Sequence, residues 1–225
     1  MSLQTDAATL CYSLYNYPDS PKVGWEYLND GTDATGIYWA MVRLNGVLWI
    51  VYRGSVTKLD WERDFYTFYD PFLHDQLGPI HPGFYEGLPD TIQVALNFAK
   101  PNDIIGVTGH SLGAGRASLA TGLLCIAKKI PAVRIVFGEP HSGKAELAQI
   151  VGNVSRSESY RADGGPNSTW EDVDLVTAVP PWFDVPGPRT NVIVNPPAND
   201  PWGVWRYHHM SGYAKTIGIQ QTWSG

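Results

Sequence analysis

Apolar side chains gather in two short runs on either side of residue 45 and predict a pair of strands. Residues 36–43 and 47–52 are rich in β-branched and aromatic side chains, and Asn45-Gly46 lies between them. Asn-Gly favours a two-residue turn because both residues accept positive φ angles. We therefore expect a β-hairpin with largely buried strands.

The next part of the chain alternates between helical and strand-like patterns. A helix is predicted over residues 89–99, a strand over 103–108, a helix rich in small residues over 112–128 and a strand over 132–137. This alternation is typical of an α/β fold, in which a mostly parallel sheet is flanked by helices.

The last third of the chain adds little regular pattern. Residues 179–205 are rich in Pro, Gly and Asn, so we expect a long surface loop without regular structure, followed by a short helix over 209–219. The sequence shows no internal repeat, and 225 residues suit one such unit. We predict a single α/β domain over residues 1–225.

The junction between the strand at 103–108 and the helix after it carries the main candidate for chemistry. It reads Gly-His-Ser-Leu-Gly, with Ser111 at its centre. A sharp strand-to-helix turn needs small residues two positions before and after its serine, and it projects the hydroxyl beyond the sheet. The N–H of Leu112 and the helix dipole would stabilise a developing oxyanion. A plain Gly/Ser surface turn is the alternative, which the flanking strand and helix disfavour.

A serine nucleophile needs a histidine base, and that histidine needs a carboxylate. In α/β-hydrolases the order along the chain is Ser, acid, His, which leaves the adjacent pair His208 and His209 as candidates. The other four histidines are excluded by position. His74 and His81 precede the serine, and His141 follows it too soon to leave room for an acid. His110 lies beside the serine and is expected to pack behind the turn.

Asp174 is the best-placed acid between the serine and the histidine pair. It begins a short apolar segment that ends at Pro180-Pro181, which would form a rigid loop at the end of a strand. Asp163 and Asp172 remain alternatives, and an aspartate in such a loop is also a common helix cap.

Four blocks of this sequence resemble the class 3 (fungal-type) lipases of the α/β-hydrolase fold, and the resemblance extends from residue 37 to residue 213. The blocks are Val-Tyr-Arg-Gly-Ser at 51–55, His-Pro-Gly-Phe-Tyr at 81–85, Thr-Gly-His-Ser-Leu-Gly-Ala at 108–114, and Asp-Leu-Val followed by Val-Pro-Pro at 174–181.

This resemblance implies a carboxylic ester hydrolase, most similar to a triacylglycerol lipase or lipolytic esterase. It implies Ser111 as nucleophile, Asp174 as acid and one histidine of the pair as base, with an oxyanion hole from the backbone N–H groups of Ser55 and Leu112. The ester would be a small molecule or a lipid, with contact at a lipid interface, and the mechanism needs no metal or organic cofactor.

The resemblance does not decide fully between the two histidines. His208 lies five residues before Tyr213, as the base does in fungal members, whereas His209 fits if Tyr207 is aligned as the residue two before the base. We favour His208 and keep His209 as the alternative.

The chain departs from the family pattern after Gly138, where His141-Ser142-Gly143 replaces the usual Arg or Lys followed by Val-Gly. The aromatic segment 61–69 falls near the lids of the family, so we expect it to border the acyl site; fixed core packing is the alternative reading.

Composition and the lengths of the apolar runs bear on the partners and the cellular location of the protein. The formal net charge is −6, which argues against a nucleic-acid surface. Only Cys11 and Cys125 are present, and we expect free thiols. The start lacks a secretory signal pattern and no transmembrane segment is visible, which fits a cytoplasmic protein or the mature form of a secreted one.

Two other functions deserve comparison with a lipase. With 9 Trp and 12 Tyr, the chain could suit a feruloyl-type esterase that acts on aromatic acyl esters, although core packing is the commoner role of such side chains. A non-catalytic binding module on the same fold is disfavoured because candidates for all three catalytic groups are present in the expected order.

Overall fold

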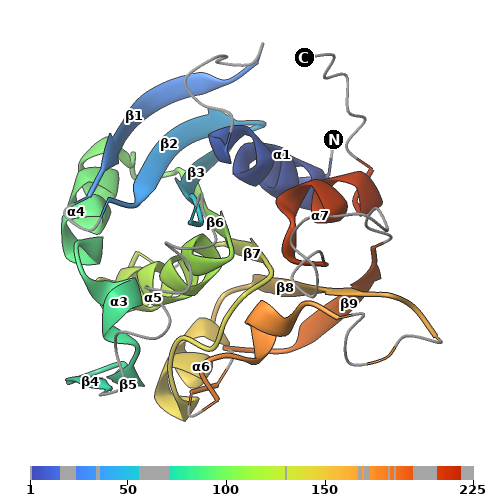
Figure 1. Ribbon diagram of the computed structural model, residues 1–225. Helices are drawn as coiled ribbons and strands as arrows, with labels where there is room; N and C mark the ends of the chain where they lie inside the picture. The colour runs from blue at the N-terminus through green and yellow to red at the C-terminus, as the bar shows by residue number, and fades with distance from the viewer. Residues whose placement is uncertain are drawn as a thin grey trace.

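A seven-stranded sheet with helices on both faces forms the centre of the protein (Figure 1). The computed structural model describes residues 2–15, 24–33, 36–55, 71–129, 131–166, 169, 173–181, 183–184, 186–194 and 207–218. The elements within them are α1 (Leu3–Tyr15), β1 (Glu26–Thr32), β2 (Tyr38–Leu44), β3 (Val47–Tyr52), β4 (Phe72–His74), β5 (Gly78–Ile80), α3 (Pro82–Tyr85), α4 (Leu88–Phe98), β6 (Ile104–His110), α5 (Leu112–Ile126), β7 (Val133–Phe137), α6 (Ala145–Val151), β8 (Arg156–Asp163), the 3-10 helix η2 (Leu175–Ala178), β9 (Arg189–Ile193) and α7 (Met210–Thr216).

The sheet is mostly parallel, as the sequence predicts. Its strand order is β1-β2-β3-β6-β7-β8-β9, and β3 and the four strands after it run parallel. The predicted hairpin forms β2 and β3, with Leu44 opposite Val47. Asn45 and Gly46 make the turn with φ angles of 50° and 79°, the positive values that this pair of residues accepts. The strand β1 adds an antiparallel edge to β2.

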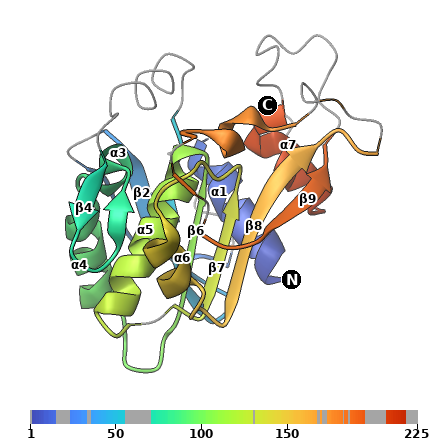
Figure 2. The same cartoon turned by 90° about the horizontal axis from the view of Figure 1, so that it is seen from below.

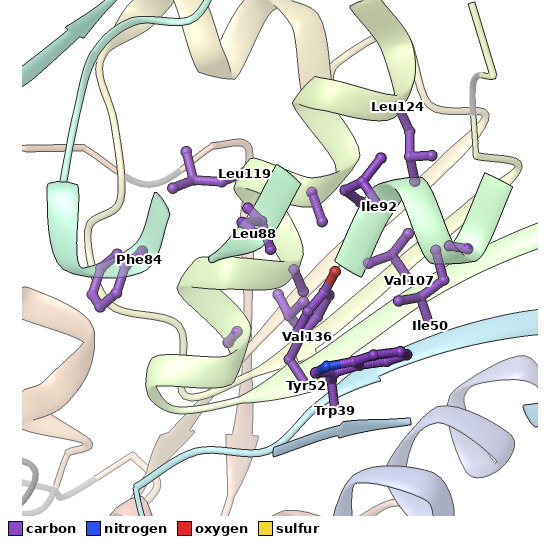
Figure 3. Packing of buried hydrophobic residues seen from close by; sticks show 14 of the residues in the cluster. Trp39, Ile50, Tyr52, Phe84, Leu88, Ile92, Val107, Leu119, Leu124 and Val136 are labelled. Atoms are coloured by element: carbon purple, nitrogen blue, oxygen red, sulfur yellow. The ribbon is translucent and has the colours of Figure 1, made fainter. Parts of the chain in front are cut away.

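The two faces of the sheet build two separate cores. Side chains alternate along β3, so Ile50 and Tyr52 point to one face while Trp49 and Val51 point to the other. The first face packs against α4, α5 and α6, and Figure 3 shows its centre. The second face packs against α1 and α7, which also contact each other, and Figure 2 shows α5 and α6 in front of the parallel strands with α1 behind them.

Arg116 fixes α5 against the loops at the edge of the sheet. Its guanidinium is fully buried, forms an ion pair with Asp33 and donates a hydrogen bond of 2.9 Å to the carbonyl oxygen of Glu86. Removal of Asp33 would leave an uncompensated buried charge, which costs about 3–5 kcal/mol of stability. The helix that follows the candidate nucleophile is therefore held rigidly.

One prediction about the C-terminal part is wrong. Residues 179–205 were expected to lack regular structure, but β9 lies within them and pairs in parallel with β8, with Ser159 opposite Arg189 and Asp163 opposite Ile193. The open edge of β8 offers backbone hydrogen bonds that override the Pro- and Gly-rich composition of the surrounding segment. The predicted final helix is present as α7.

The expectations about the cysteines, a membrane-spanning helix and the aromatic segment 61–69 can be compared with the described residues. Cys11 and Cys125 are both free thiols, as predicted, and burial raises the pKa of Cys11 to about 12. No helix in the described part of the chain has the length and apolar character needed to cross a membrane. The aromatic segment 61–69 lies outside the described residues.

Candidate active site

Ser111 occupies a sharp turn between β6 and α5. Its φ and ψ angles are 60° and −131°, a conformation that is rare for any residue except glycine and is typical of strained functional turns. A Cβ atom on Gly109 would lie 2.1 Å from the carbonyl oxygen of Gly113, and a Cβ on Gly113 would lie 2.2 Å from that of Tyr52. The two glycines are therefore required by the close approach of the backbone.

Backbone hydrogen bonds hold this turn. The N–H of Ser111 donates to the carbonyl oxygen of Phe137 over 3.0 Å, and the carbonyl oxygen of Ser111 accepts from the N–H groups of Ala114 and Gly115. Leu112 is the first residue of α5, where N–H groups have no acceptor within the helix. Its N–H and the positive end of the helix dipole lie beside the serine.

Asp174 and His208 are hydrogen-bonded partners. Asp174 precedes η2 and is fully buried, and its carboxylate oxygens lie 2.8 and 2.9 Å from Nδ1 of His208. Because a carboxylate accepts, Nδ1 carries the proton, and in a neutral imidazole Nε2 is then the basic nitrogen. The Nε2 atom is buried and makes no hydrogen bond within the described residues. The Asp174 carboxylate thus holds the imidazole by its Nδ1 edge.

The surroundings of Gly138 show that Asp174 and His208 lie beside the turn that carries Ser111. A Cβ atom on Gly138 would be 2.8 Å from Cε1 of His208 and 2.8 Å from Oδ2 of Asp174. The residue before it, Phe137, accepts the hydrogen bond from the Ser111 N–H. The imidazole, the carboxylate and the serine turn therefore meet at the carboxyl end of β7.

The structure describes two of the alternatives from the sequence, Asp163 and His209. Asp163 ends β8, where it accepts hydrogen bonds from the Gly165 N–H at 2.8 Å and from Nδ2 of Asn191 at 3.3 Å. Asp172 lies outside the described residues. His209 is the N-cap residue of α7, and the structure brings His208 rather than His209 into contact with Asp174.

The remaining histidines have other surroundings. His81 is buried and stacks on Phe84, with ring centroids 4.3 Å apart, and burial lowers its pKa to about 4. In the hairpin of β4 and β5, Nδ1 of His74 accepts backbone N–H groups. His141, which departs from the family pattern, donates from Nδ1 to the carbonyl oxygen of Pro180 at 3.0 Å, and burial lowers its pKa. The ring of His110 stacks on that of His208, with centroids 4.7 Å apart, and its Nδ1 lies 2.6 Å from the hydroxyl of Tyr15.

Tyr213 is a residue of this site that the sequence analysis used only as a spacing marker. Its buried hydroxyl donates to Oδ2 of Asp174 over 2.5 Å and accepts from the N–H of Ala162 over 2.9 Å. Burial and the adjacent carboxylate raise the pKa of Tyr213 well above its usual value, so the hydroxyl keeps its proton. The spacing of five residues between His208 and Tyr213 is the sequence signal that could have indicated this role.

We expect Tyr213→Phe to lower the turnover of an ester about 10-fold, because a hydrogen bond to a charged group is worth about 1.5–3 kcal/mol and this one holds the carboxylate of Asp174. The measurement is kcat and KM together with Tm. Tyr52→Phe is the matched control, since its buried hydroxyl bonds Thr91 at 2.9 Å on the other face of the sheet. Equal turnover in the two variants would contradict a role for Tyr213 at the acid.

Comparison with protein families finds a match to the lipases of class 3. The family model of class 3 lipases matches residues 49–183, which is more than half of the chain. A search of curated protein sequences found no match.

Solved structures with the same fold include several fungal lipases. The lipase of Rhizomucor miehei in complex with its propeptide has 19% identity and a TM-score of 0.67, with 84% of this chain and 66% of that chain covered. This chain thus spans just under two thirds of that length. A triacylglycerol lipase whose catalytic centre is a serine protease triad has 15% identity and a TM-score of 0.69, with 96% and 95% covered. The mono- and diacylglycerol lipase of Aspergillus oryzae has 24% identity and a TM-score of 0.63, with 87% and 78% covered.

The structural likeness establishes the α/β-hydrolase fold, and the family match covers both Ser111 and Asp174. The chain therefore belongs to the class 3 lipase family of carboxylic ester hydrolases.

Proposed function

We propose that this protein is a lipolytic esterase that uses Ser111 as nucleophile, His208 as general base and Asp174 as the supporting acid. The observation that carries the proposal is the buried pair of Asp174 and His208, whose Nε2 atom makes no hydrogen bond within the described residues although it lies beside the serine turn. A buried basic nitrogen without a partner is costly unless a substrate or nucleophile uses it.

The proposed reaction proceeds through an acyl-enzyme. Ser111 Oγ attacks the ester carbonyl while His208 Nε2 takes the hydroxyl proton, and Asp174 stabilises the imidazolium that forms. Collapse of the tetrahedral intermediate breaks the bond to the alkoxy group, which leaves as an alcohol with the proton from His208. A water molecule then attacks the acyl group, again losing its proton to His208, and the second collapse releases the carboxylic acid and restores Ser111.

Two backbone N–H groups would stabilise the oxyanion in both steps. Leu112 offers one at the N-terminus of α5, as described above. Ser55 offers the other from the loop after β3: a Cβ on the preceding Gly54 would lie 2.8 Å from Cβ of Ser111, so this loop passes directly beside the nucleophile. Each such donor contributes about 10²–10³ to kcat in enzymes of this kind.

Lipid esters are the favoured substrates. The chain belongs to the class 3 lipases, and two of the structures with the same fold are a triacylglycerol lipase and a mono- and diacylglycerol lipase. The aromatic composition does not favour aromatic acyl esters, because several of the large aromatic side chains fill the two cores: Trp39, Trp49, Tyr52, Phe84, Phe137 and Tyr213.

A substrate series tests the proposal. We expect p-nitrophenyl esters of fatty acids to be hydrolysed with a higher kcat/KM than methyl esters of hydroxycinnamic acids, and a fluorophosphonate probe to label Ser111. A preference for the hydroxycinnamoyl esters would contradict the lipolytic function while leaving the serine mechanism intact. Absence of both hydrolysis and labelling in the folded protein would contradict the enzyme mechanism and favour a binding module.

A further inference from the structure

Two successive hydrogen bonds connect the helix α1 to His208. The hydroxyl of Tyr15, the last residue of α1, lies 2.6 Å from Nδ1 of His110. Nε2 of His110 lies 2.7 Å from the backbone carbonyl oxygen of His208. His110 is the residue immediately before Ser111, so this chain of contacts joins α1, the serine turn and the base.

The chemistry of the groups fixes the direction of both bonds. A carbonyl oxygen only accepts, so Nε2 of His110 carries a hydrogen and donates it to His208. In the neutral imidazole Nδ1 is then an acceptor, and the hydroxyl of Tyr15 donates to it. Burial and the neighbouring His208 lower the pKa of His110 well below its usual value, which keeps this ring neutral, and burial raises the pKa of Tyr15.

His208 is consequently held at three places. Asp174 holds the edge of its ring at Nδ1, the ring of His110 stacks on its face with centroids 4.7 Å apart, and Nε2 of His110 holds its backbone carbonyl. Two of the three contacts come from the residue that is covalently bonded to the nucleophile. The position of the base relative to Ser111 therefore depends on the orientation of the His110 ring.

The hydroxyl of Tyr15 sits at the centre of this arrangement. A Cβ atom on Gly54 would lie only 2.4 Å from the Tyr15 oxygen, 2.6 Å from the carbonyl oxygen of His110 and 2.8 Å from Cβ of Ser111. The hydroxyl is thus packed between the turn that carries the nucleophile and the loop that leads to Ser55. The rings of Tyr15 and His110 also meet edge to face, with centroids 5.5 Å apart.

We propose that Tyr15 and His110 are positioning residues that hold the base His208 in place. The helix α1, which carries Tyr15, then contributes to the active site, although it lies outside the segment matched by the family model. The proposal rests on the proposed function of Ser111, Asp174 and His208. Orientation matters because displacing a catalytic group by about 1 Å can cost about 10²-fold in rate. Neutrality matters because a charged His110 would oppose the positive charge that forms on the stacked His208 ring during catalysis.

The test compares two hydrogen bonds that both join α1 to β6. Tyr15→Phe removes the donor to His110, whereas Thr108→Val removes a buried bond of 3.1 Å between Cys11 Sγ and Thr108 Oγ1 that touches neither His110 nor His208. We expect Tyr15→Phe to lower kcat about 10-fold with KM unchanged. Thr108→Val should lower Tm by about as much as Tyr15→Phe does, since each variant loses one buried hydrogen bond, but its kcat should stay within about 2-fold of wild type. Equal kcat in the two variants at matched Tm would overturn the proposal.

Two substitutions at His110 separate positioning from stability. Gln keeps an N–H donor that can reach the His208 carbonyl, whereas Leu keeps the volume and has none. We expect His110→Gln to retain at least about 10-fold more kcat than His110→Leu. If both variants have the same kcat, or if His110→Leu is as active as wild type, the hydrogen bond to His208 has no role in positioning.

A spectroscopic measurement follows the base directly. The Nδ1 proton between His208 and Asp174 should give a downfield proton resonance in the NMR spectrum, assigned by its loss in Asp174→Asn. We expect Tyr15→Phe to shift or broaden this resonance and Thr108→Val to leave it unchanged; an unchanged resonance in Tyr15→Phe would contradict the proposal. Failure of the proposed function would be distinct, since it would appear as full activity in Ser111→Ala.

Discussion

Ser111→Ala is expected to lower ester turnover by about 10³-fold or more while the protein stays folded. The substitution removes the attacking oxygen, and the catalysis that remains comes from the oxyanion donors and substrate binding alone. Alanine at φ 60° has the same backbone strain as serine, so Tm should change little. The measurement is the initial rate with a p-nitrophenyl ester, alongside Tm and circular dichroism.

Ser142→Ala is the matched control for this experiment. Ser142 is a buried serine like Ser111, and its hydroxyl has no hydrogen-bond partner within the described residues, so its removal should affect neither folding nor rate. Near wild-type turnover in a folded Ser111→Ala protein would contradict the serine mechanism as a whole.

His208→Gln is expected to abolish activity to a similar degree, whereas His209→Gln should keep most of it. Of the two histidines, His208 is the one whose Nδ1 is hydrogen-bonded to the buried carboxylate of Asp174. Adjacent residues at the start of a helix point in different directions, so one imidazole alone can serve the serine. Steady-state ester hydrolysis on both folded variants gives the answer. If His209→Gln were the inactive variant, the triad would be Ser111, Asp174 and His209.

The parts of the fold that sequence reasoning predicts are those with strong local signals. Asn45-Gly46 identifies the hairpin because a two-residue turn restricts the choice of residues, and the two glycines around Ser111 identify the sharp turn for the same reason. The strand β9 has no comparable local signal. It forms because β8 presents an open edge, and that edge exists only in the folded sheet.

The site itself is predicted only as far as its spacing along the chain allows. Chain order and local context favour Asp174 over Asp163 and Asp172 and leave two histidines, but any of these aspartates could also serve as an ordinary loop or helix-cap residue. The contact between Asp174 and His208, by contrast, joins residues 34 apart, and that between Tyr15 and His110 joins residues 95 apart. Such pairs form only in the folded chain, where α1 and the segment that leads into α7 come together on the same face of the sheet.

The contact between α1 and α7 bears on how much of the chain constitutes a functional unit. A chain shortened to residues 49–183 would keep Ser111 and Asp174, yet it would lose the proposed base His208 and both helices that cover the second core. The sheet would then present Val51, Ile135 and Phe137 to water, an apolar surface of the kind that promotes aggregation. Both a soluble surface and the proposed catalytic site therefore need α1, α7 and His208, which lie outside the segment that matches the family model.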